Sequence, residues 1–375
     1  MNACDALIVG GGPAGSTCAW KLRQAGLDVV VVDRAVFPRD KVCAGWITPQ
    51  VIQDLHLDPD VYRAGRTFQP INGFRVGLID RDEAVEARYA RPVSFGIRRC
   101  EFDGYLLARS GARVLAGTPI DSIRREAGRW ILNDAVEAPV LVGAGGHFCP
   151  VARLLNGAGD RAPLITAQEA EFAIDPADGA SFATTPEQPE LYFRADLTGY
   201  GWCFRKQDHL NIGFGRIGSR ALPAETAGFI DFLKARRRIP AKPSWRLRGH
   251  AYLLAGGARR RAVGDGVMLA GDAAGLAYPQ SGEGIRPAIE SGLLAASTIL
   301  EAGGRYDRGR LEAYERQLHA RFDAAPFTRL LSRVLPSGLA ASLAPRLMDS
   351  PWFVRHVLLD RWFLRAHEAP LTKCA

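Results

Sequence analysis

The sequence predicts an α/β protein of two lobes, one built on a parallel sheet and one on an antiparallel sheet, followed by a helical C-terminus. An apolar run leads through a glycine-rich turn into a helical pattern at residues 6–25, and a second apolar run meets glycines at residues 267–275. Between them, stretches of residues 168–216 alternate apolar and polar side chains. A length of 375 residues also favours two lobes, because single cores seldom grow so large.

The first of these segments reads as a strand, a turn and a helix. Residues 6–9 are apolar, the letters GGGPAG occupy residues 10–15, and a helical pattern covers residues 16–25. A second strand is expected at residues 28–32 and ends in Asp33. Together these elements make a βαβ unit of the Rossmann type.

The glycines and the acid of this unit each have a physical task. Gly10 permits the tight turn, Gly12 lets backbone amides reach a pyrophosphate, and Gly15 lets helix and strand pack closely. The helix N-terminus would then hold the phosphates. Asp33 is placed to accept hydrogen bonds from the ribose hydroxyls of adenosine. The unit therefore predicts a bound dinucleotide, with NAD and FAD both open at this point.

A second glycine-rich segment follows the apolar residues 267–270. It reads GDAAG at residues 271–275 and PQSGEGI at residues 279–285, before a predicted helix over residues 286–302. It resembles the second FAD signature of the flavoprotein family that contains aromatic hydroxylases, flavin halogenases and geranylgeranyl reductases. In that family the aspartate, here Asp272, binds the ribityl chain, and the glycines bring backbone amides to the flavin ring. The resemblance implies FAD rather than NAD.

Two further stretches resemble elements of the same family. RCEFD at residues 99–103 is similar to its RxxFD element, in which the arginine, here Arg99, touches the cofactor. A surface arginine at a helix start is the alternative. VLVGAGG at residues 140–146 is similar to its GADG motif, but Gly145 stands where hydroxylases have an aspartate for pyridine-nucleotide contacts. This difference argues against a hydroxylase-type use of NADPH.

The residues expected to bind FAD come from all of these segments and from the stretch after Asp33. Gly282 and Gly284 would allow close approach to the flavin, and the helix that follows them would stabilise negative charge on its reduced ring. The predicted set is Gly10, Gly12, Pro13, Ala14, Gly15, Asp33, Arg34, Cys43, Ala44, Arg99, Gly271, Asp272, Pro279, Gly282, Gly284 and Ile285.

Residues 37–45, FPRDKVCAG, indicate which branch of the family is involved. They are similar to the FPRxKxCxG stretch of geranylgeranyl reductases, in which the cysteine, here Cys43, lies close to the flavin. A thiol can donate a proton weakly, or tune the flavin, without bringing a fixed charge into an apolar cavity. A cysteine that only fills core space is the alternative.

Residues 200–204 form an aromatic run on a predicted strand. Residues two apart in a strand share a face, so Tyr200, Trp202 and Phe204 would present one apolar surface, which suits an isoprenoid chain. With the glycines after it, the run resembles the family's YxWxFP…GxG signature, except that Arg205 replaces the proline. Plain core packing is the alternative. The expected substrate contacts are Tyr200, Trp202, Phe204, Gly213 and Gly215.

These motifs divide the chain into discontinuous domains. The predicted FAD-binding domain comprises residues 1–75, 95–160 and 255–300, the substrate-binding domain residues 76–94 and 161–254, and the C-terminal helical region residues 301–375. Strands of an antiparallel sheet are expected at residues 168–174, 190–195, 201–204 and 209–216. A helix is expected at residues 307–322, and apolar helical segments continue to Trp362 and Leu364.

The resemblance implies an FAD-dependent oxidoreductase that reduces carbon–carbon double bonds of a geranylgeranyl-type isoprenoid by hydride transfer from reduced flavin. Cys43, Tyr200 and Trp202 are the candidate catalytic residues. The sequence has a single complete GxGxxG unit, which FAD would occupy, so NAD(P)H would bind transiently or reduced ferredoxin would supply the electrons. A monooxygenase or halogenase acting on an aromatic or other small molecule is the first alternative. A non-redox role for FAD is the second.

The composition limits the remaining classes of function. Hydrophobic residues make up 47% and charged residues 23%, which excludes a disordered or fibrous chain. The net charge of +8 suits an anionic dinucleotide, a diphosphate substrate or an anionic membrane surface, although a general preference for arginine gives the same excess. A nucleic-acid partner is not predicted. Seven cysteines without a CxxC pair and scattered histidines argue against disulfides, zinc and other metals.

Membrane attachment is left open by the sequence. No signal-peptide pattern and no run of about 18 apolar residues are found, which predicts a cytoplasmic protein with at most peripheral membrane contact. Residues 352–365 are apolar with interspersed arginines, a pattern that an interfacial helix and a buried packing helix share. The sequence predicts no oligomeric state.

Overall fold

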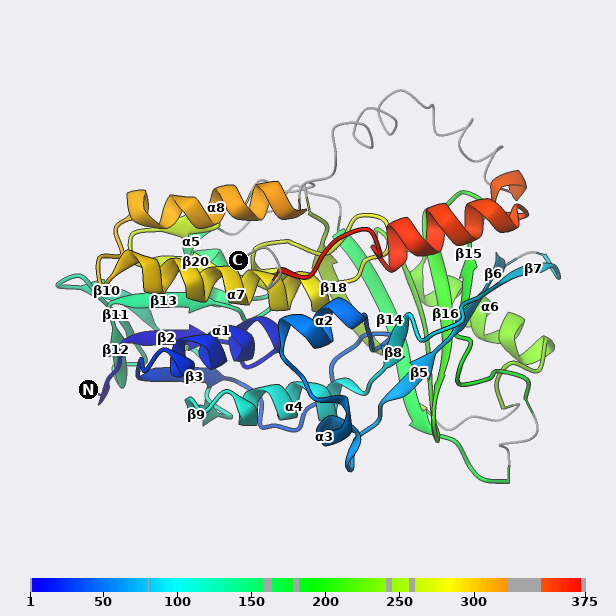
Figure 1. The fold of residues 1–375 in the computed structure, drawn as a ribbon, viewed down its shortest axis with the longest axis horizontal. Coiled ribbons are helices and arrows are strands. Elements are labelled where there is room, and N and C mark those ends of the chain that lie inside the picture. Colours follow the sequence, from blue (N-terminus) through cyan, green and yellow to red (C-terminus); the bar gives the residue numbers. More distant parts are fainter. Residues whose placement is uncertain are drawn as a thin grey trace. The chain divides into compact units, whose positions relative to one another are not determined.

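The computed structural model describes residues 2–79, 81–157, 164–177, 182–240, 245–255, 260–322 and 345–371. The chain forms two compact units, and each is assembled from three separate stretches of sequence. Unit 1 comprises Met1–Asp40, Cys100–Ala162 and Tyr252–Ala324, and unit 2 comprises Lys41–Arg99, Pro163–Ala251 and Ala325–Ala375. The predicted fold class, a parallel-sheet lobe and an antiparallel-sheet lobe, is confirmed (Figure 1).

Unit 1 is built on a six-stranded sheet of order β19-β20-β13-β2-β3-β9. All neighbouring strands are parallel except β19 and β20. The residues of the three central strands β20, β13 and β2 are buried, as expected where a parallel sheet is covered on both faces. The strands are β2 (Ala6–Val9), β3 (Val29–Asp33), β9 (Arg113–Ala116), β13 (Val140–Gly143), β19 (Val263–Gly264) and β20 (Val267–Leu269).

The helices of unit 1 pack closely on this sheet and on one another. A Cβ at Gly292 of α7 would overlap the carbonyl oxygen of Ala14 in α1, so these two helices meet at backbone distance (Figure 1). The Tyr314 hydroxyl of α8 donates to the Leu269 carbonyl at 2.7 Å and holds α8 to β20. The helices are α1 (Pro13–Gln24), α4 (Arg99–Arg109), α5 (Pro150–Asn156), α7 (Ile285–Ala302) and α8 (Arg308–Phe322), with the 3₁₀ turn η1 (Gly271–Ala273). The helices predicted at residues 286–302 and 307–322 are therefore confirmed.

A second, four-stranded sheet completes the described part of unit 1. Its order is β1-β12-β11-β10, and only the β1–β12 pair is parallel. The strands are β1 (Asn2–Ala3), β10 (Ile123–Glu126), β11 (Arg129–Leu132) and β12 (Val136–Ala138).

Unit 2 is built on a seven-stranded sheet of order β18-β14-β17-β16-β15-β6-β7. The pairs that join β14 to β17, β17 to β16, β16 to β15 and β6 to β7 are antiparallel, whereas β15 and β6 run parallel. The strands are β6 (Gly73–Leu78), β7 (Ala84–Arg88), β14 (Leu164–Ala173), β15 (Glu190–Phe193), β16 (Gly199–Lys206), β17 (His209–Ile217) and β18 (Arg248–Leu253). All four predicted strands are present, with β14 and β16 beginning earlier than their alternation suggested.

The smaller elements of unit 2 include residues that the sequence assigned to the FAD-binding domain. A three-stranded sheet of order β4-β8-β5 and the β6 strand place residues 41–75 and 95–99 in unit 2. Compactness does not show which residues bind a dinucleotide, so the functional boundaries stay a prediction. The elements are β4 (Trp46–Ile47), β5 (Gln69–Ile71), β8 (Ser94–Gly96), α2 (Pro49–Asp54), α3 (Pro59–Arg63) and α6 (Leu222–Ala235).

The C-terminal apolar stretch forms η2 (Phe353–Phe363), a π-helix that is red in Figure 1. Val354, Leu358 and Phe363 are buried in a cluster with Trp46 and Phe204. This packing corresponds to the buried-helix alternative for residues 352–365. Within the described ranges, no helix has the length and apolar character needed to cross a membrane.

The packing of η2 leads to a stability prediction. Phe363 is 1% exposed and its ring lies 5.5 Å from the Tyr200 ring and 6.0 Å from the Trp46 ring, centroid to centroid. Phe363→Ala should lower the free energy of unfolding by about 3–5 kcal/mol, because it leaves a cavity among aromatic side chains. Urea denaturation measures this loss. The control Trp352→Ala removes a side chain that is 66% exposed and should change stability by less than about 0.5 kcal/mol. Equal effects of the two variants would contradict the buried packing.

Candidate functional site

Three glycine-bearing turns begin side by side at one edge of the unit 1 sheet. β13 lies between β2 and β20, and Gly143 at its end is paired in register with Val9 of β2 and with Leu269 of β20. Because the strands are parallel, the chain leaves all three at the same carboxyl edge. Ligands of open α/β sheets bind outside this edge. The structure therefore brings together motifs that are more than 100 residues apart in the sequence.

Close backbone approach explains two glycines of the first turn. Gly10 has a φ of +110°, and a Cβ there would overlap the carbonyl of Ala144 at the end of β13. A Cβ at Gly15 would overlap the carbonyl of Gly10 itself. Both positions therefore exclude side chains, as the predicted tight turn and helix packing require. Helix α1 begins at Pro13, earlier than its pattern indicated, so its N-terminus directly follows this turn.

Asp33 is held in place at the carboxyl end of β3. Its Oδ2 accepts a hydrogen bond from the Gly11 N–H at 2.7 Å, and its Oδ1 accepts one from the Ala35 N–H at 2.8 Å. The carboxylate is thus oriented beside the glycine turn and remains half-buried. This position fits a carboxylate that accepts hydrogen bonds from ribose hydroxyls.

Asp272 occupies the 3₁₀ turn that follows β20. The Gly271 N–H donates to Ser291 Oγ of α7 at 2.9 Å, and Arg260 donates to the Ala273 carbonyl at 2.8 Å. A Cβ at Gly284, just before α7, would lie 3.1 Å from Asp272 Oδ1. The turn, the carboxylate and the start of α7 therefore adjoin one another. Arg260 and Ser291 belong to this arrangement but are not part of any motif, so the sequence did not point to them.

The residues of these turns fit FAD in chemical kind. The oriented carboxylate of Asp33 suits the ribose hydroxyls, and the carboxylate of Asp272, beside Gly284, suits the ribityl hydroxyls. The glycine turns before α1 and α7 offer backbone amides at helix N-termini. Pro279, Gly282 and Ile285 belong to the same unit. Cys43, Ala44 and Arg99 belong to unit 2. Direct contact of each of these residues with FAD stays a prediction.

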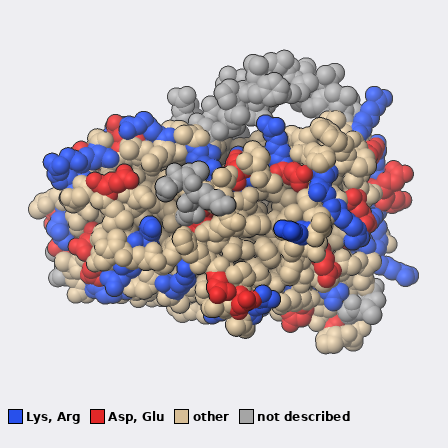
Figure 2. All heavy atoms as spheres, in the orientation of Figure 1, with Lys and Arg blue, Asp and Glu red and all other residues tan. Residues whose placement is uncertain are grey.

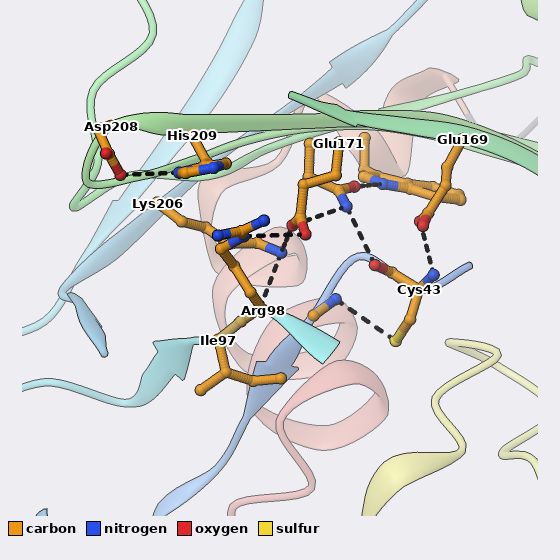
Figure 3. Close-up of polar contacts among 11 residues, drawn as sticks. Cys43, Ile97, Arg98, Glu169, Glu171, Lys206, Asp208 and His209 are labelled. Atoms are coloured by element: carbon orange, nitrogen blue, oxygen red, sulfur yellow. Dashed lines mark hydrogen bonds and ion pairs between the residues drawn. The ribbon is translucent and has the colours of Figure 1, made fainter. Parts of the chain in front are cut away.

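Unit 2 contains a polar group, here called the Cys43 cluster, composed of Cys43, Glu169, Glu171, Lys206 and Asn211. Glu169, Lys206 and Asn211 are buried, whereas Cys43 and Glu171 are partly buried, and Figure 3 labels all of them except Asn211. Glu169 and Glu171 are two apart on β14 and so share a face. The Cys43 N–H donates to Glu169 Oε2 at 2.6 Å, and Lys206 Nζ donates to Glu171 Oε1 at 2.7 Å. Asn211 Nδ2 donates to the Cys43 carbonyl at 3.2 Å and to Glu171 Oε1 at 3.3 Å. The Cys43 backbone is therefore held on both sides.

The two carboxyl groups of the cluster have opposite pKa shifts. Burial raises the pKa of Glu169 to about 8, an effect that the nearby Glu171 charge increases and the Lys206 charge opposes. Burial also acts on Glu171, but Lys206, Arg98 and Asn211 outweigh it and lower the pKa of that carboxyl. At neutral pH, Glu169 is mainly protonated and Glu171 is ionised. Such a pair is a common arrangement at sites of acid–base chemistry.

Glu169 and Glu171 were not predicted as site residues, although the sequence contains a signal for them. Charged residues at alternate positions of a predicted strand, Glu169 and Glu171, would place two carboxylates on one face of the sheet. A lysine at the end of the aromatic run, Lys206, is a second such signal. It is 1% exposed, and its Nζ also donates to the Ile97 carbonyl at 2.9 Å.

The predicted aromatic face of β16 is present, but Trp202 and Phe204 are buried and the face packs on Phe363 of η2, as the alternative of plain core packing expects. Tyr200, Trp202 and Phe204 contribute to a single apolar cluster, in which the Tyr200 and Trp202 ring centroids are 6.1 Å apart. The Trp202 indole N–H donates to Asn211 Oδ1 at 2.7 Å and so connects this face to the Cys43 cluster. A Cβ at Gly213 would overlap the Trp202 indole, which gives that glycine a packing role.

Gly215 and Arg205 complete the signature region. The nearest Trp202 atom would be 3.7 Å from a Cβ at Gly215, so this position is less crowded than Gly213. Arg205, which replaces the family's proline, donates to the Gln207 carbonyl at 3.3 Å and lies over the Phe182 ring. Substrate contact by the predicted residues of this region stays a prediction.

Comparisons with known proteins identify the family. A family model described as FAD dependent oxidoreductase matches residues 5–90. The chain is 30% identical to the menaquinone reductase of Mycolicibacterium smegmatis over 333 residues, which cover 81% of this chain and 78% of that protein. It is 29% identical to the digeranylgeranylglycerophospholipid reductase of Methanothrix thermoacetophila, covering 84% of this chain and 82% of that protein. The chain belongs to the geranylgeranyl reductase family of FAD-dependent oxidoreductases.

This geranylgeranyl reductase family assignment agrees with the fold. A geranylgeranyl bacteriochlorophyll reductase-like protein from Thermoplasma acidophilum matches with a TM-score of 0.78 at 21% identity, covering 100% of this chain and 98% of the other. The family model and the similar curated proteins, rather than the fold, make the chain an FAD-dependent enzyme.

The glycine turn leads to a prediction for cofactor binding. Gly10→Ala should weaken FAD binding at least about tenfold, because the added Cβ overlaps the Ala144 carbonyl and forces the turn to move. Titration of the apoprotein with FAD, followed by flavin fluorescence, measures the affinity. Gly104→Ala is the matched control, since a Cβ there would lie 3.8 Å from the nearest atom. Wild-type affinity in Gly10→Ala would refute the steric argument.

The raised pKa of Glu169 leads to a prediction for stability. The folded protein keeps a proton that the unfolded chain releases, so stability should fall as the pH rises from about 4.5 to about 8. One such proton changes the free energy of unfolding by at most about 1.4 kcal/mol per pH unit. Glu169→Gln should remove this slope, whereas Glu86→Gln, at an exposed carboxyl, should keep it. Urea denaturation at several pH values compares the slopes, and parallel curves for wild type and Glu169→Gln would contradict the shift.

Proposed function

We propose that this flavoenzyme reduces carbon–carbon double bonds of an isoprenoid, geranylgeranyl-type substrate. The observation that carries the proposal is the connection, within unit 2, between an apolar aromatic face and the Cys43 segment. Asn211 makes this connection, because it accepts from the Trp202 indole and donates to the Cys43 carbonyl. An aromatic face suits a chain that offers few polar atoms, and the adjoining polar cluster suits proton transfer.

The similarity to named relatives supports the same substrate class. Digeranylgeranylglycerophospholipid and menaquinone, which appear in the names of two relatives, both contain an isoprenoid chain. The resemblance of residues 37–45 to the cysteine-containing stretch of geranylgeranyl reductases adds to this support. Gly145, in place of the hydroxylase aspartate, weighs against the alternative of aromatic hydroxylation.

The roles of the residues follow from this assignment. The turns at Gly10 and Asp272 bind FAD, which supplies a hydride when it is bound and reduced. Tyr200, the half-buried member of the aromatic face, contacts the isoprenoid, while Trp202 and Phe204, which are buried behind it, shape that apolar wall and exclude water. Cys43 lies where the polar cluster meets this apolar face and is the predicted residue at the reacting bond. NAD(P)H, binding transiently, or reduced ferredoxin provides the electrons.

The charge of the protein agrees with a substrate that has an anionic head group. The net charge is +8, and on the face shown in Figure 2 the basic side chains lie among acidic ones rather than in a single patch. On this face, attraction of a diphosphate would therefore come from individual Lys and Arg side chains. A large basic surface of the kind that nucleic acids require is not seen on this face.

The proposed reaction predicts a defined mass change. Under anaerobic conditions, FAD-loaded protein reduced with dithionite should convert geranylgeranyl diphosphate into products heavier by 2 Da for each double bond reduced, because each saturation adds two hydrogens. Mass spectrometry of the extracted lipid measures this. The same protein with oxidised flavin is the control and should give no product. Absence of any mass gain with isoprenoid substrates, together with oxygen uptake driven by an aromatic compound, would favour a monooxygenase instead.

A further inference from the structure

The Cys43 cluster contains a buried carboxyl group, Glu169, to which the proposed function assigns no role. We propose that the Glu169 carboxyl supplies the proton that completes the reduction of the double bond. This inference rests on the proposed function and names a further catalytic residue for it.

The position of Glu169 favours this role. Its side chain comes from the middle of β14, is 6% exposed, and meets the Cys43 N–H at 2.6 Å through Oε2. Figure 3 shows the carboxyl directed at the Cys43 backbone. Cys43 belongs to the stretch that resembles the flavin-adjacent segment of geranylgeranyl reductases. The acid is therefore fixed at the segment where the proposal places the reacting bond.

The cations of the cluster are directed at the other carboxylate. Glu171 Oε1 accepts from Lys206 at 2.7 Å, and Glu171 Oε2 lies 3.5 Å from Arg98 Nε. Glu169 instead meets a backbone N–H, which stabilises a carboxylate less than a cation does. Burial without a directly paired cation favours the neutral acid. This arrangement stores a proton on Glu169 at neutral pH.

The other titratable groups of the cluster are less suited to donate. Lys206 donates to Glu171 and to the Ile97 carbonyl, so its ammonium group is engaged in an ion pair and a hydrogen bond. Glu171 is ionised. His209 lies beside Asp208 at 2.8 Å, at the far end of the group in Figure 3.

The proposed step balances in atoms and electrons. The π bond of the alkene breaks, one carbon gains a hydride from the reduced flavin, and the other gains the Glu169 proton. Two C–H bonds form, the substrate gains two electrons, and Glu169 becomes a carboxylate. Lys206 lies close enough to lower the cost of this transient charge, since it already acts on the Glu169 carboxyl. Solvent returns the proton before the next turnover.

Glu169→Gln tests the role directly, because an amide oxygen still accepts from the Cys43 N–H but cannot donate an acidic proton. The variant should bind FAD and be reduced by dithionite as the wild type is, while single-turnover saturation of geranylgeranyl diphosphate falls by about 10²- to 10⁴-fold. Glu169→Asp should recover part of the rate. The wild-type rate should decline as the pH rises through about 8, and this decline should be absent in Glu169→Gln. Glu86→Gln is the matched control on the surface of unit 2 and should keep the wild-type rate and profile.

An infrared measurement on flavin-free protein tests the proton itself. The wild type should show a protonated-carboxyl C=O band that disappears as the pH passes about 8, and Glu169→Gln should lack this band. Absence of the band in the wild type overturns the inference. So does a Glu169→Gln rate within twofold of the wild type, with the same pH profile. A wild type that never saturates an isoprenoid overturns the proposed function, and the inference with it.

Discussion

The close backbone approach at the carboxyl edge of the unit 1 sheet constrains the positions of β2, β13 and α1. Gly10 lies against the Ala144 carbonyl, and Gly15, in the first turn of α1, lies against the Gly10 carbonyl. Neither glycine has room for a side chain. This crowding keeps β2, β13 and the N-terminus of α1 in fixed register. A similar approach between Gly292 and Ala14 places α7 against α1. The positions that would present amides to a dinucleotide are thus set by sterics before any ligand binds.

Unit 2 depends on a different physical constraint, the cost of burying charge. Lys206 and Glu171 are stable in the interior only because each meets the other and neighbouring polar atoms. Asn211 extends this pairing to Cys43 and Trp202, which makes one polar network out of residues on three strands and a loop. Glu169 avoids the same cost by holding a proton. The polar cluster that joins β14, β16 and β17 therefore also contains a neutral acid, Glu169.

A fold shared by many flavoproteins does not select the chemistry, which depends on the residues placed around the flavin. In this chain the differences from hydroxylases are local. Gly145 replaces the aspartate of the GADG motif. The segment around Cys43 contains a thiol, and the backbone N–H of Cys43 donates to the buried Glu169 carboxyl group. The aromatic face of β16 and the Cys43 cluster adjoin each other through Asn211, so the proposed apolar binding and proton transfer would both fall to one part of unit 2.

The sequence by itself determined the βαβ unit, the glycine turns and the strands of the second sheet, because local periodicity and glycine spacing encode them. It also indicated the family, through the resemblance of its motifs. Only the tertiary structure decided which carboxyl of Glu169 and Glu171 keeps a proton, since burial and the position of Lys206 depend on distant strands. It also decided that Gly213 makes room for Trp202, and that residues 353–363 pack as a π-helix against aromatic side chains. Those outcomes rest on contacts between segments far apart in the chain, which no local pattern records.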